Sequence, residues 1–156
     1  MSRARTILFF PLVLLLTLST VISGCSAGDS SEGGHNHPMA GLAAMPADVQ
    51  TAPVAVQQAY QFAVANPDVV TQIPCYCGCG AIGHTSNYAC YVSGVDASGA
   101  ITYDTHALGC SICVDISLDA MRLVDEGKSV PEIRTYVDTV YARYGPSNMP
   151  PVGSGG

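Results

Sequence analysis

The stretch "PCYCGCG", Pro74 to Gly80, decides the fold, because it places Cys75, Cys77 and Cys79 at every second position. In an extended segment alternate side chains point the same way, so this run can present three sulfurs to one side. The two glycines of the run let the backbone curl around whatever the sulfurs hold. The stretch therefore predicts an irregular, sulfur-rich loop within a small domain.

Three further cysteines follow the loop, namely Cys90, Cys110 and Cys113. The last two form a C-x-x-C pair, "CSIC", at the predicted start of a helix. There the helix dipole and the free backbone N–H groups lower the pKa of a thiol. Thiolate is both the nucleophile of disulfide exchange and a metal ligand, so this pair alone does not choose between the two.

Three hypotheses explain six thiols. Neighbouring cysteines of the C-x-C-x-C run are strained as disulfide partners, so a staple of three bridges would pair them with the three later cysteines. A thiol–disulfide oxidoreductase acting on exported cysteines would use Cys110 as the attacking sulfur. The third hypothesis is a soft-metal site. Under the staple hypothesis, the protein would be a disulfide-stapled interaction module with no chemistry.

The metal hypothesis uses all the sulfurs and two flanking histidines. Cu(I) prefers thiolate ligands, whereas Zn(II) accepts cysteine together with histidine. Five or six convergent thiolates exceed the four that one zinc ion needs, which favours Cu(I) with zinc as the alternative. The expected ligands are Cys75, Cys77, Cys79, Cys110 and Cys113, with Cys90, His84 and His106 as completing groups.

The N-terminus predicts export. Residues 1–24 combine Arg3 and Arg5 with the apolar run "ILFFPLVLLLTLSTVI", as a signal peptide does. The following "ISGC" resembles the lipobox of bacterial lipoproteins, in which Cys25 becomes lipidated. We therefore expect a lipid-anchored protein on the extracytoplasmic face of the cell membrane. An ordinary cleaved signal with an incidental Cys25 is the alternative.

The net charge of the chain and its expected export limit the kinds of partner that it can bind. Without the signal, four basic side chains remain against twelve acidic ones, a net charge near −8. Nucleic-acid binding needs a basic face, and this chain has none. Exported cysteines usually meet oxidising conditions, so disulfides are the default that a metal hypothesis must displace. The expected partners are the membrane, through Cys25, and a metal-donor or metal-acceptor protein.

Residues 25–49 are small, polar and interrupted by glycine and proline, which predicts a flexible tether. Within it, "HNHPM" (residues 35–39) offers imidazole and thioether groups that suit copper. Residues 50–145 form the expected cysteine-rich helical domain. Residues 146–156, "PSNMPPVGSGG", are expected to be a disordered tail.

Three helices are expected in the domain. The first begins near Thr51 and Pro53, carries one apolar stripe, and stops at "NPD" (residues 66–68). The second covers about 111–126 and ends at Gly127. The third begins with the capping box of Ser129 and Glu132 and stops at residues 145–146.

The expected apolar positions of these helices share helical spacing. They are Ala52, Val56, Ala59, Tyr60 and Ala63 in the first, Cys113, Ile116, Ala120, Leu123 and Val124 in the second, and Ile133, Val137, Val140, Tyr141 and Tyr144 in the third. The run "CYVSGVDASGAITYDT" (residues 90–105) predicts one short β-hairpin. The fold class is thus mainly α: a small three-helix domain with a cysteine-rich irregular loop region. A domain of about 95 residues buries a modest core and benefits from disulfides or a metal.

Several strings resemble a known family. "PCYCGCG", "GHTSNYACYV" and "DTHALGCSICVDISLDAMRLVDEGKSVPEIRTYVD" are similar to the PCYCGC-motif family of bacterial lipoproteins over residues 50–145. That resemblance implies the lipid anchor and the cysteine cluster as one package, without a settled activity.

A weaker likeness concerns the C-terminal third. "EGKSVPEIRTYV" and "ARYG" resemble the helical hairpin of CcmH-type cytochrome c maturation thiol reductases. In their L-R-C-x-x-C-Q motif, Gly109 stands here for the arginine and Val114 for the glutamine. The C-x-x-C pair also lies closer to the hairpin turn, so the likeness implies the helical fold more than the reductase role. Our expectation is a lipoprotein for copper capture, delivery or tolerance.

Overall fold

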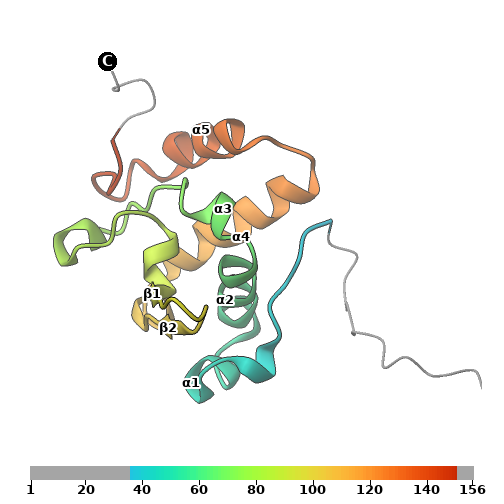
Figure 1. Ribbon diagram of the computed structural model, residues 1–156. Helices are drawn as coiled ribbons and strands as arrows, with labels where there is room; N and C mark the ends of the chain where they lie inside the picture. Colours follow the sequence, from blue (N-terminus) through green and yellow to red (C-terminus); the bar gives the residue numbers. More distant parts are fainter. Residues whose placement is uncertain (1–35, 151–156) are drawn as a thin grey trace, which may run out of the picture. The chain divides into compact units, whose positions relative to one another are not determined.

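The computed structural model describes residues 36–150 (Figure 1). The predicted signal segment, the predicted lipidation site Cys25 and His35 of the "HNHPM" run lie outside the described residues. Residues 151–156 of the predicted tail also lie outside them. Within residues 36–150, no helix has the length and apolar character needed to cross a membrane.

Three main helices build the domain: α2 (Val54–Ala65), α4 (Ser111–Asp125) and α5 (Val130–Tyr141). Helix α4 packs on α2 and on α5, as Figure 1 shows. The short α3 (Pro67–Val70) follows α2 directly. The mainly helical fold with three helices is confirmed.

Local sequence sets the helix ends. Asn66 separates α2 from α3, whose first residue is Pro67, so the "NPD" stop is confirmed. Gly127 has φ +75°, and Lys128 N donates to Leu123 O at 2.9 Å, which closes α4 with a Schellman motif. The capping box of Ser129 and Glu132 is present at the start of α5.

The predicted apolar faces of the helices are mostly buried, but one residue of these faces and one helix start differ from the prediction. Tyr144 is 50% exposed, because α5 ends at Tyr141 and the chain then turns away from the helical stripe. Thr51 does not start α2; its Oγ1 donates to Ala47 O at 3.0 Å and closes the preceding α1 (Ala47–Gln50). Pro53 stands as the N-cap of α2.

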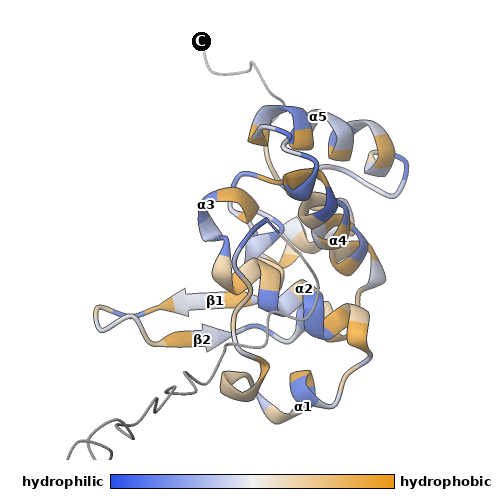
Figure 2. Cartoon of the chain, turned by 90° about the vertical axis from the view of Figure 1, so that its right-hand side faces the viewer, coloured by the Kyte–Doolittle hydropathy of each residue, from blue (hydrophilic) through white to orange (hydrophobic). Residues whose placement is uncertain are grey.

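The predicted hairpin is also confirmed. Strands β1 (Val92–Val95) and β2 (Ile101–Tyr103) pair antiparallel, with an irregularity between Val92 and Gly94. Figure 2 shows the hairpin extending away from the helices, and in the sequence it lies between Cys90 and Cys110. Its turn is closed by Asp96, which accepts hydrogen bonds from Ser98 and Ala100.

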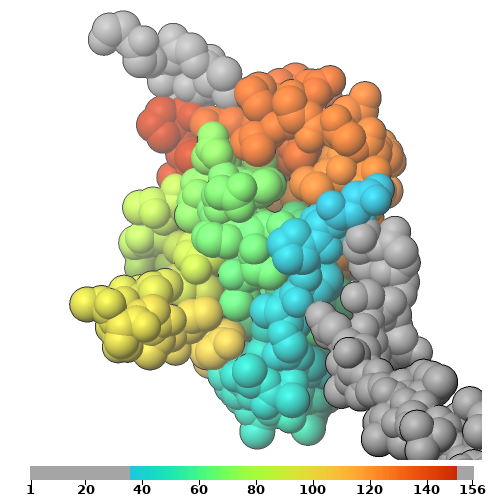
Figure 3. Space-filling model, turned by 45° about the vertical axis from the view of Figure 1, so that its right-hand side comes forward, coloured from blue at the N-terminus to red at the C-terminus, as the bar shows by residue number. Residues whose placement is uncertain are grey.

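Residues 36–49, part of the predicted tether, carry the 3-10 helix η1 (Leu42–Ala44) and α1. His37 Nδ1 lies 2.8 Å from Asp125 Oδ1, and its ring meets Phe62 edge-on at 5.0 Å. Met45 and Val49 are buried. Figure 3 shows this segment running along the helical surface. The packed part of the chain thus begins before residue 50, because apolar and hydrogen-bonding side chains hold this segment to the helices.

The segment after α5 returns to the cysteine loop. Asn148 N donates to Cys75 O at 3.1 Å, so residues 146–150 of the predicted tail contact the domain. A Cβ on Gly145 would lie 2.9 Å from Tyr76 O, so only glycine allows this close approach of the two backbones. We call residues 145–150 the C-terminal strap.

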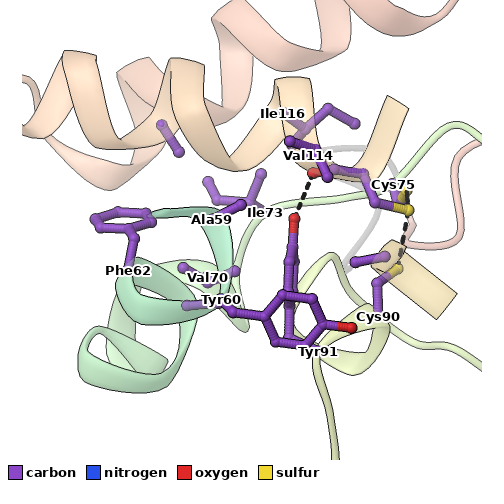
Figure 4. Close-up of a cluster of buried hydrophobic side chains, with 14 of the residues drawn as sticks. Ala59, Tyr60, Phe62, Val70, Ile73, Cys75, Cys90, Tyr91, Val114 and Ile116 are labelled. Atoms are coloured by element: carbon purple, nitrogen blue, oxygen red, sulfur yellow. Dashed lines mark hydrogen bonds between the residues drawn. The ribbon is translucent and has the colours of Figure 1, made fainter. Parts of the chain in front are cut away.

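The core lies between α2 and α4 and reaches the cysteines. Tyr60 and Tyr91, both fully buried, meet edge-to-face with ring centroids 4.9 Å apart. Tyr91 Oη donates to Cys113 O at 2.7 Å. Figure 4 shows Cys75 and Cys90 at the edge of this apolar cluster, with their sulfurs near the start of α4. The core therefore fixes the position of the cysteine side chains.

Candidate metal centre

Three separate chain segments supply the cysteines. Cys75 to Cys79 form a loop that turns at Gly78, where φ is +84°, and enters the 3-10 helix η2 (Cys79–Ile82). Cys90 ends the 3-10 helix η3 (Tyr88–Cys90). Cys110 is the N-cap of α4, and Cys113 lies in its first turn. Gly78 turns the chain between Cys77 and Cys79, and the sulfurs of Cys75, Cys77 and Cys79 lie within 4.8 Å of one another.

The sulfurs of these segments meet at short distances. Cys75 Sγ lies 3.4 Å from Cys77 Sγ and 3.3 Å from Cys113 Sγ. Cys113 Sγ lies 3.6 Å from Cys77 Sγ and 3.2 Å from Cys90 Sγ, which in turn is 3.8 Å from Cys79 Sγ. The loop and the start of α4 therefore share one sulfur cluster, as the metal hypothesis requires.

All six cysteines between residues 36 and 150 are unbonded thiols. Four of them are buried, whereas Cys77 and Cys110 are half-buried. The arrangement is that of convergent donors and not of three bonded pairs. Cys110, the expected attacking sulfur of a redox pair, lies with Cys113 among the other donors instead of standing apart from them.

Both predicted histidines reach the cluster. His84 Nδ1 lies 3.5 Å from Cys90 Sγ, and His106 Nε2 lies 3.5 Å from Cys77 Sγ. The two rings meet edge-to-face with centroids 5.1 Å apart. His106 lies in the 3-10 helix η4 (His106–Leu108), which leads into the C-x-x-C pair. All eight predicted donors thus come together.

Asp104 organises both histidines and was not predicted from the sequence. Its Oδ1 accepts the backbone N–H of His106 at 2.8 Å, and its Oδ2 lies 3.5 Å from His84 Nε2. A carboxylate on the outer nitrogen of a ligating histidine fixes the ring and its tautomer. The string "DTH" held a signal for it, because aspartate often accepts the N–H two residues on.

The backbone of Asp104 ties the centre to the core. Its carbonyl oxygen accepts the hydroxyl of Tyr60 on α2 at 2.7 Å, and its N–H donates to Tyr91 O at 2.9 Å. Because both tyrosines are fully buried, the position of Asp104 is set by the core. The histidines are therefore preorganised through the same residues that stabilise the fold.

Asn148 of the C-terminal strap also contacts the centre. Its Oδ1 accepts the N–H of Cys75 at 2.7 Å, and its Nδ2 donates to His84 O at 3.1 Å. The same Nδ2 lies 3.6 Å from Cys79 Sγ. A Cβ on Gly80 would lie 3.3 Å from the Asn148 Cβ, so the loop passes close to the strap at this position. No short sequence pattern predicts the contact between Asn148 and the cysteine loop.

The thiols differ in acidity. Hydrogen bonds with Cys113 and Cys90 hold the pKa of Cys75 well below its usual range. Burial raises the pKa of Cys77 and of Cys79, and the negative charge at Cys75 adds to both shifts. The hydrogen bond with Cys75 raises the pKa of Cys113. One thiolate is thus stabilised, and removing further protons calls for a positive charge among the sulfurs.

The donor atoms fall into groups that could hold a metal ion. Those of Cys77, His106, Cys110 and Cys113 lie within 4.8 Å of one another. The same holds for the donors of Cys79, His84, Cys90 and His106. Two sulfur-only groups join them: Cys75, Cys77 and Cys79, and Cys75, Cys90 and Cys113. The clustered cysteines and histidines are able to form a metal site.

This fold and site define a class: a small helical domain whose cysteine loop and helix N-terminus enclose a thiol–imidazole cluster. The chain belongs to the family described as "Protein of unknown function with PCYCGC motif", whose model matches residues 13–152. No curated protein and no solved structure matches the chain.

Proposed function

We propose that this protein is an extracytoplasmic lipoprotein that binds Cu(I) through its cysteine cluster and serves copper capture, delivery or tolerance. The observation that carries the proposal is the convergence of six unbonded thiols from three chain segments with two imidazoles. Thiolate is the donor that Cu(I) prefers.

The number of sulfurs favours Cu(I) over zinc. A single tetrahedral zinc ion takes four protein ligands, and either four-residue group would satisfy it. Cys75 contacts Cys77 and Cys113 directly and would then remain a spare buried thiol. Copper(I) sharing sulfurs in a small cluster uses every donor, so the full set supports copper.

The sequence supports the proposed lipid anchor. The signal-like residues 1–24 and the lipobox-like "ISGC" support lipidation of Cys25 and placement on the outer face of the cell membrane. The family match begins at residue 13, within the signal-like segment, which supports treating export and cluster as one unit.

A metal-donor or metal-acceptor protein is the proposed partner. Cys77 and Cys110 are half-buried, whereas the other four cluster cysteines are buried. An incoming thiolate or thioether can therefore reach the ion beside these two sulfurs first. Transfer would proceed by stepwise exchange of ligands between the two proteins.

Metal analysis with thiol counting tests the proposal. The full chain is purified in detergent under reducing, anaerobic conditions, and loaded separately with Cu(I) and with Zn(II). We expect tightly held copper that resists a competing chelator. The thiols should escape detection by a thiol reagent only while the metal is present. Stronger retention of zinc than of copper would identify zinc, and not copper, as the metal of the site.

Two other results would each identify a function other than metal binding. Metal-free protein with one labile disulfide between Cys110 and Cys113, and reductase activity lost in Cys110→Ser, would identify a thiol–disulfide oxidoreductase. Protein with neither metal nor free thiols that unfolds on reduction would identify a disulfide-stapled module.

Cys25→Ser separates the anchor from the metal site. The variant should lose its acyl chains and leave the membrane fraction, while it keeps the copper content of the unchanged chain. Cys75→Ser is the matched control, because it should stay in the membrane fraction and bind less copper. Membrane retention of Cys25→Ser would contradict the proposed anchor.

A further inference from the structure

We propose that the cluster holds two metal ions side by side, an outer ion that exchanges readily and an inner ion that is retained. This inference rests on the proposed metal-binding function. The outer set is Cys77, His106, Cys110 and Cys113. The inner set is Cys79, His84 and Cys90. Cys75 lies between the sets.

The donors divide because of their spacing. The two four-residue groups share only His106, and its Nε2 lies 3.5 Å from Cys77 Sγ, which assigns it to the outer set. Among the described residues, no group joins Cys110 with Cys79 or His84. One ion therefore cannot bind donors at both ends of the cluster, and a single ion held by one four-residue group would leave four of the eight donors unused.

The sulfurs at the boundary are placed to be shared. Cys113 of the outer set lies 3.2 Å from Cys90 of the inner set, and Cys75 lies 3.3 Å from Cys113. These three sulfurs also form a group of their own. A thiolate between two ions can bind both, which joins the two sets into one centre.

Charge supports two ions over one. Bound metal requires deprotonated cysteines, and buried thiolates without nearby cations are costly. The three arginines of the described chain contact carboxylates or a tyrosine ring on α4, α5 and the residues that follow. Lys128, the one lysine of the described chain, is exposed in the turn between α4 and α5. The negative charge of the cluster must therefore be offset by the ions themselves, and a second ion offsets more of it.

The two sets differ in access. Cys77 and Cys110, both half-buried, belong to the outer set. In the inner set Cys79 and Cys90 are buried and His84 is half-buried, and Asn148 of the C-terminal strap contacts Cys79 Sγ and the His84 carbonyl oxygen. A competing ligand reaches the outer ion first, so the outer ion is the one that a partner protein exchanges.

Native mass spectrometry of the full chain provides the test. The reduced protein in detergent is titrated anaerobically with Cu(I) and, in parallel, with Zn(II). We expect species with one ion and then with two ions, and saturation at two. A chelator should remove copper in a fast and a slow phase of equal amplitude.

Single substitutions assign the fast and the slow phase of copper release to the outer and the inner set. Cys110→Ser should bind one ion and lose the fast phase, whereas Cys90→Ser should bind one ion and lose the slow phase. His84→Gln repeats the inner-set test at a half-buried position, in case Cys90→Ser does not fold. Ser98→Ala, on the hairpin turn, is the control and should keep two ions.

The outcomes separate this inference from the proposed function. Saturation at one ion, a cooperative jump to more than two, or loss of both ions from folded Cys110→Ser would overturn the two-ion centre while leaving metal binding intact. Failure to bind either metal would overturn the proposed function itself.

Discussion

Asp104 holds both histidines of the centre without being a predicted ligand. Its two carboxylate oxygens contact the His106 N–H and the His84 ring. Asp104→Asn keeps an oxygen that can accept the His106 N–H, but removes the charge beside His84. Loss of such a partner costs about 10–100-fold in metal affinity. We expect a decrease of about 10-fold or more, measured by chelator competition.

Asp115→Asn is the matched control for this prediction, because it makes the same charge change at an exposed position of α4. Its metal affinity should equal that of the unchanged chain. Equal affinities for the Asp104 and Asp115 variants would show that the contact with His84 has no part in metal binding.

Asn148 contacts three parts of the cluster through one side chain. Asn148→Ala removes the acceptor for the Cys75 N–H and the donor to the His84 carbonyl. We expect unchanged metal content at saturation and faster release of the slow phase, because the strap no longer closes over Cys79. Stopped-flow transfer to a chelator measures the rates.

Asn36→Ala provides the comparison, since the Asn36 side chain donates to Asp125 O at the opposite end of α4 and its loss should not alter release. A slow phase that Asn148→Ala leaves at its original rate would mean that the strap covers the inner set without slowing exchange.

At the scale of elements, the helices follow from local signals that the sequence displays. The NPD stop, the glycine after α4 and the capping box before α5 each act within a few residues, so each could be predicted. The strap and residues 36–49 could not, because their order depends on distant partners. His37 pairs with Asp125, and Asn148 with Cys75.

The capping box supports a stability prediction. Ser129→Ala removes the N-cap side chain of α5 and should lower the free energy of unfolding by about 1 kcal/mol. Metal content should stay the same, because Ser129 opens α5 at the end of the α4–α5 turn, whereas the cysteines lie at the start of α4. Chemical denaturation with metal analysis tests both statements.

Thr135→Ala is the control for the capping variant. Thr135 is exposed in the interior of α5, where alanine has the higher helix propensity, so stability should stay equal or rise slightly. A loss of metal from Ser129→Ala would show that the α4–α5 hairpin, and not the cysteine loop alone, sets the geometry of the centre.

At the scale of the whole described domain, the centre and the core are one structure. The eight cysteines and histidines that the sequence singled out lie together, and their identity alone made them candidates. The sequence did not predict which sulfurs meet, since that follows from Tyr91 and Tyr60 holding Cys113 and Asp104 in place. A domain of this size has a modest core, and a metal can add to its stability.

Metal removal should therefore loosen one part of the domain more than another. Bound metal would join the loop at residues 75–79, Cys90 and the start of α4, whereas α4 and α5 also pack on each other. Binding stabilises the folded state by about 4 kcal/mol when free metal exceeds Kd a thousandfold. Chelation should lower the unfolding midpoint and speed amide exchange at Cys75 and Asn87 first, because Asn148 and Ile73 accept these N–H groups. Hydrogen exchange of loaded and stripped protein measures this, and an equal rise across α5 would mean that the metal stabilises the domain only as a whole.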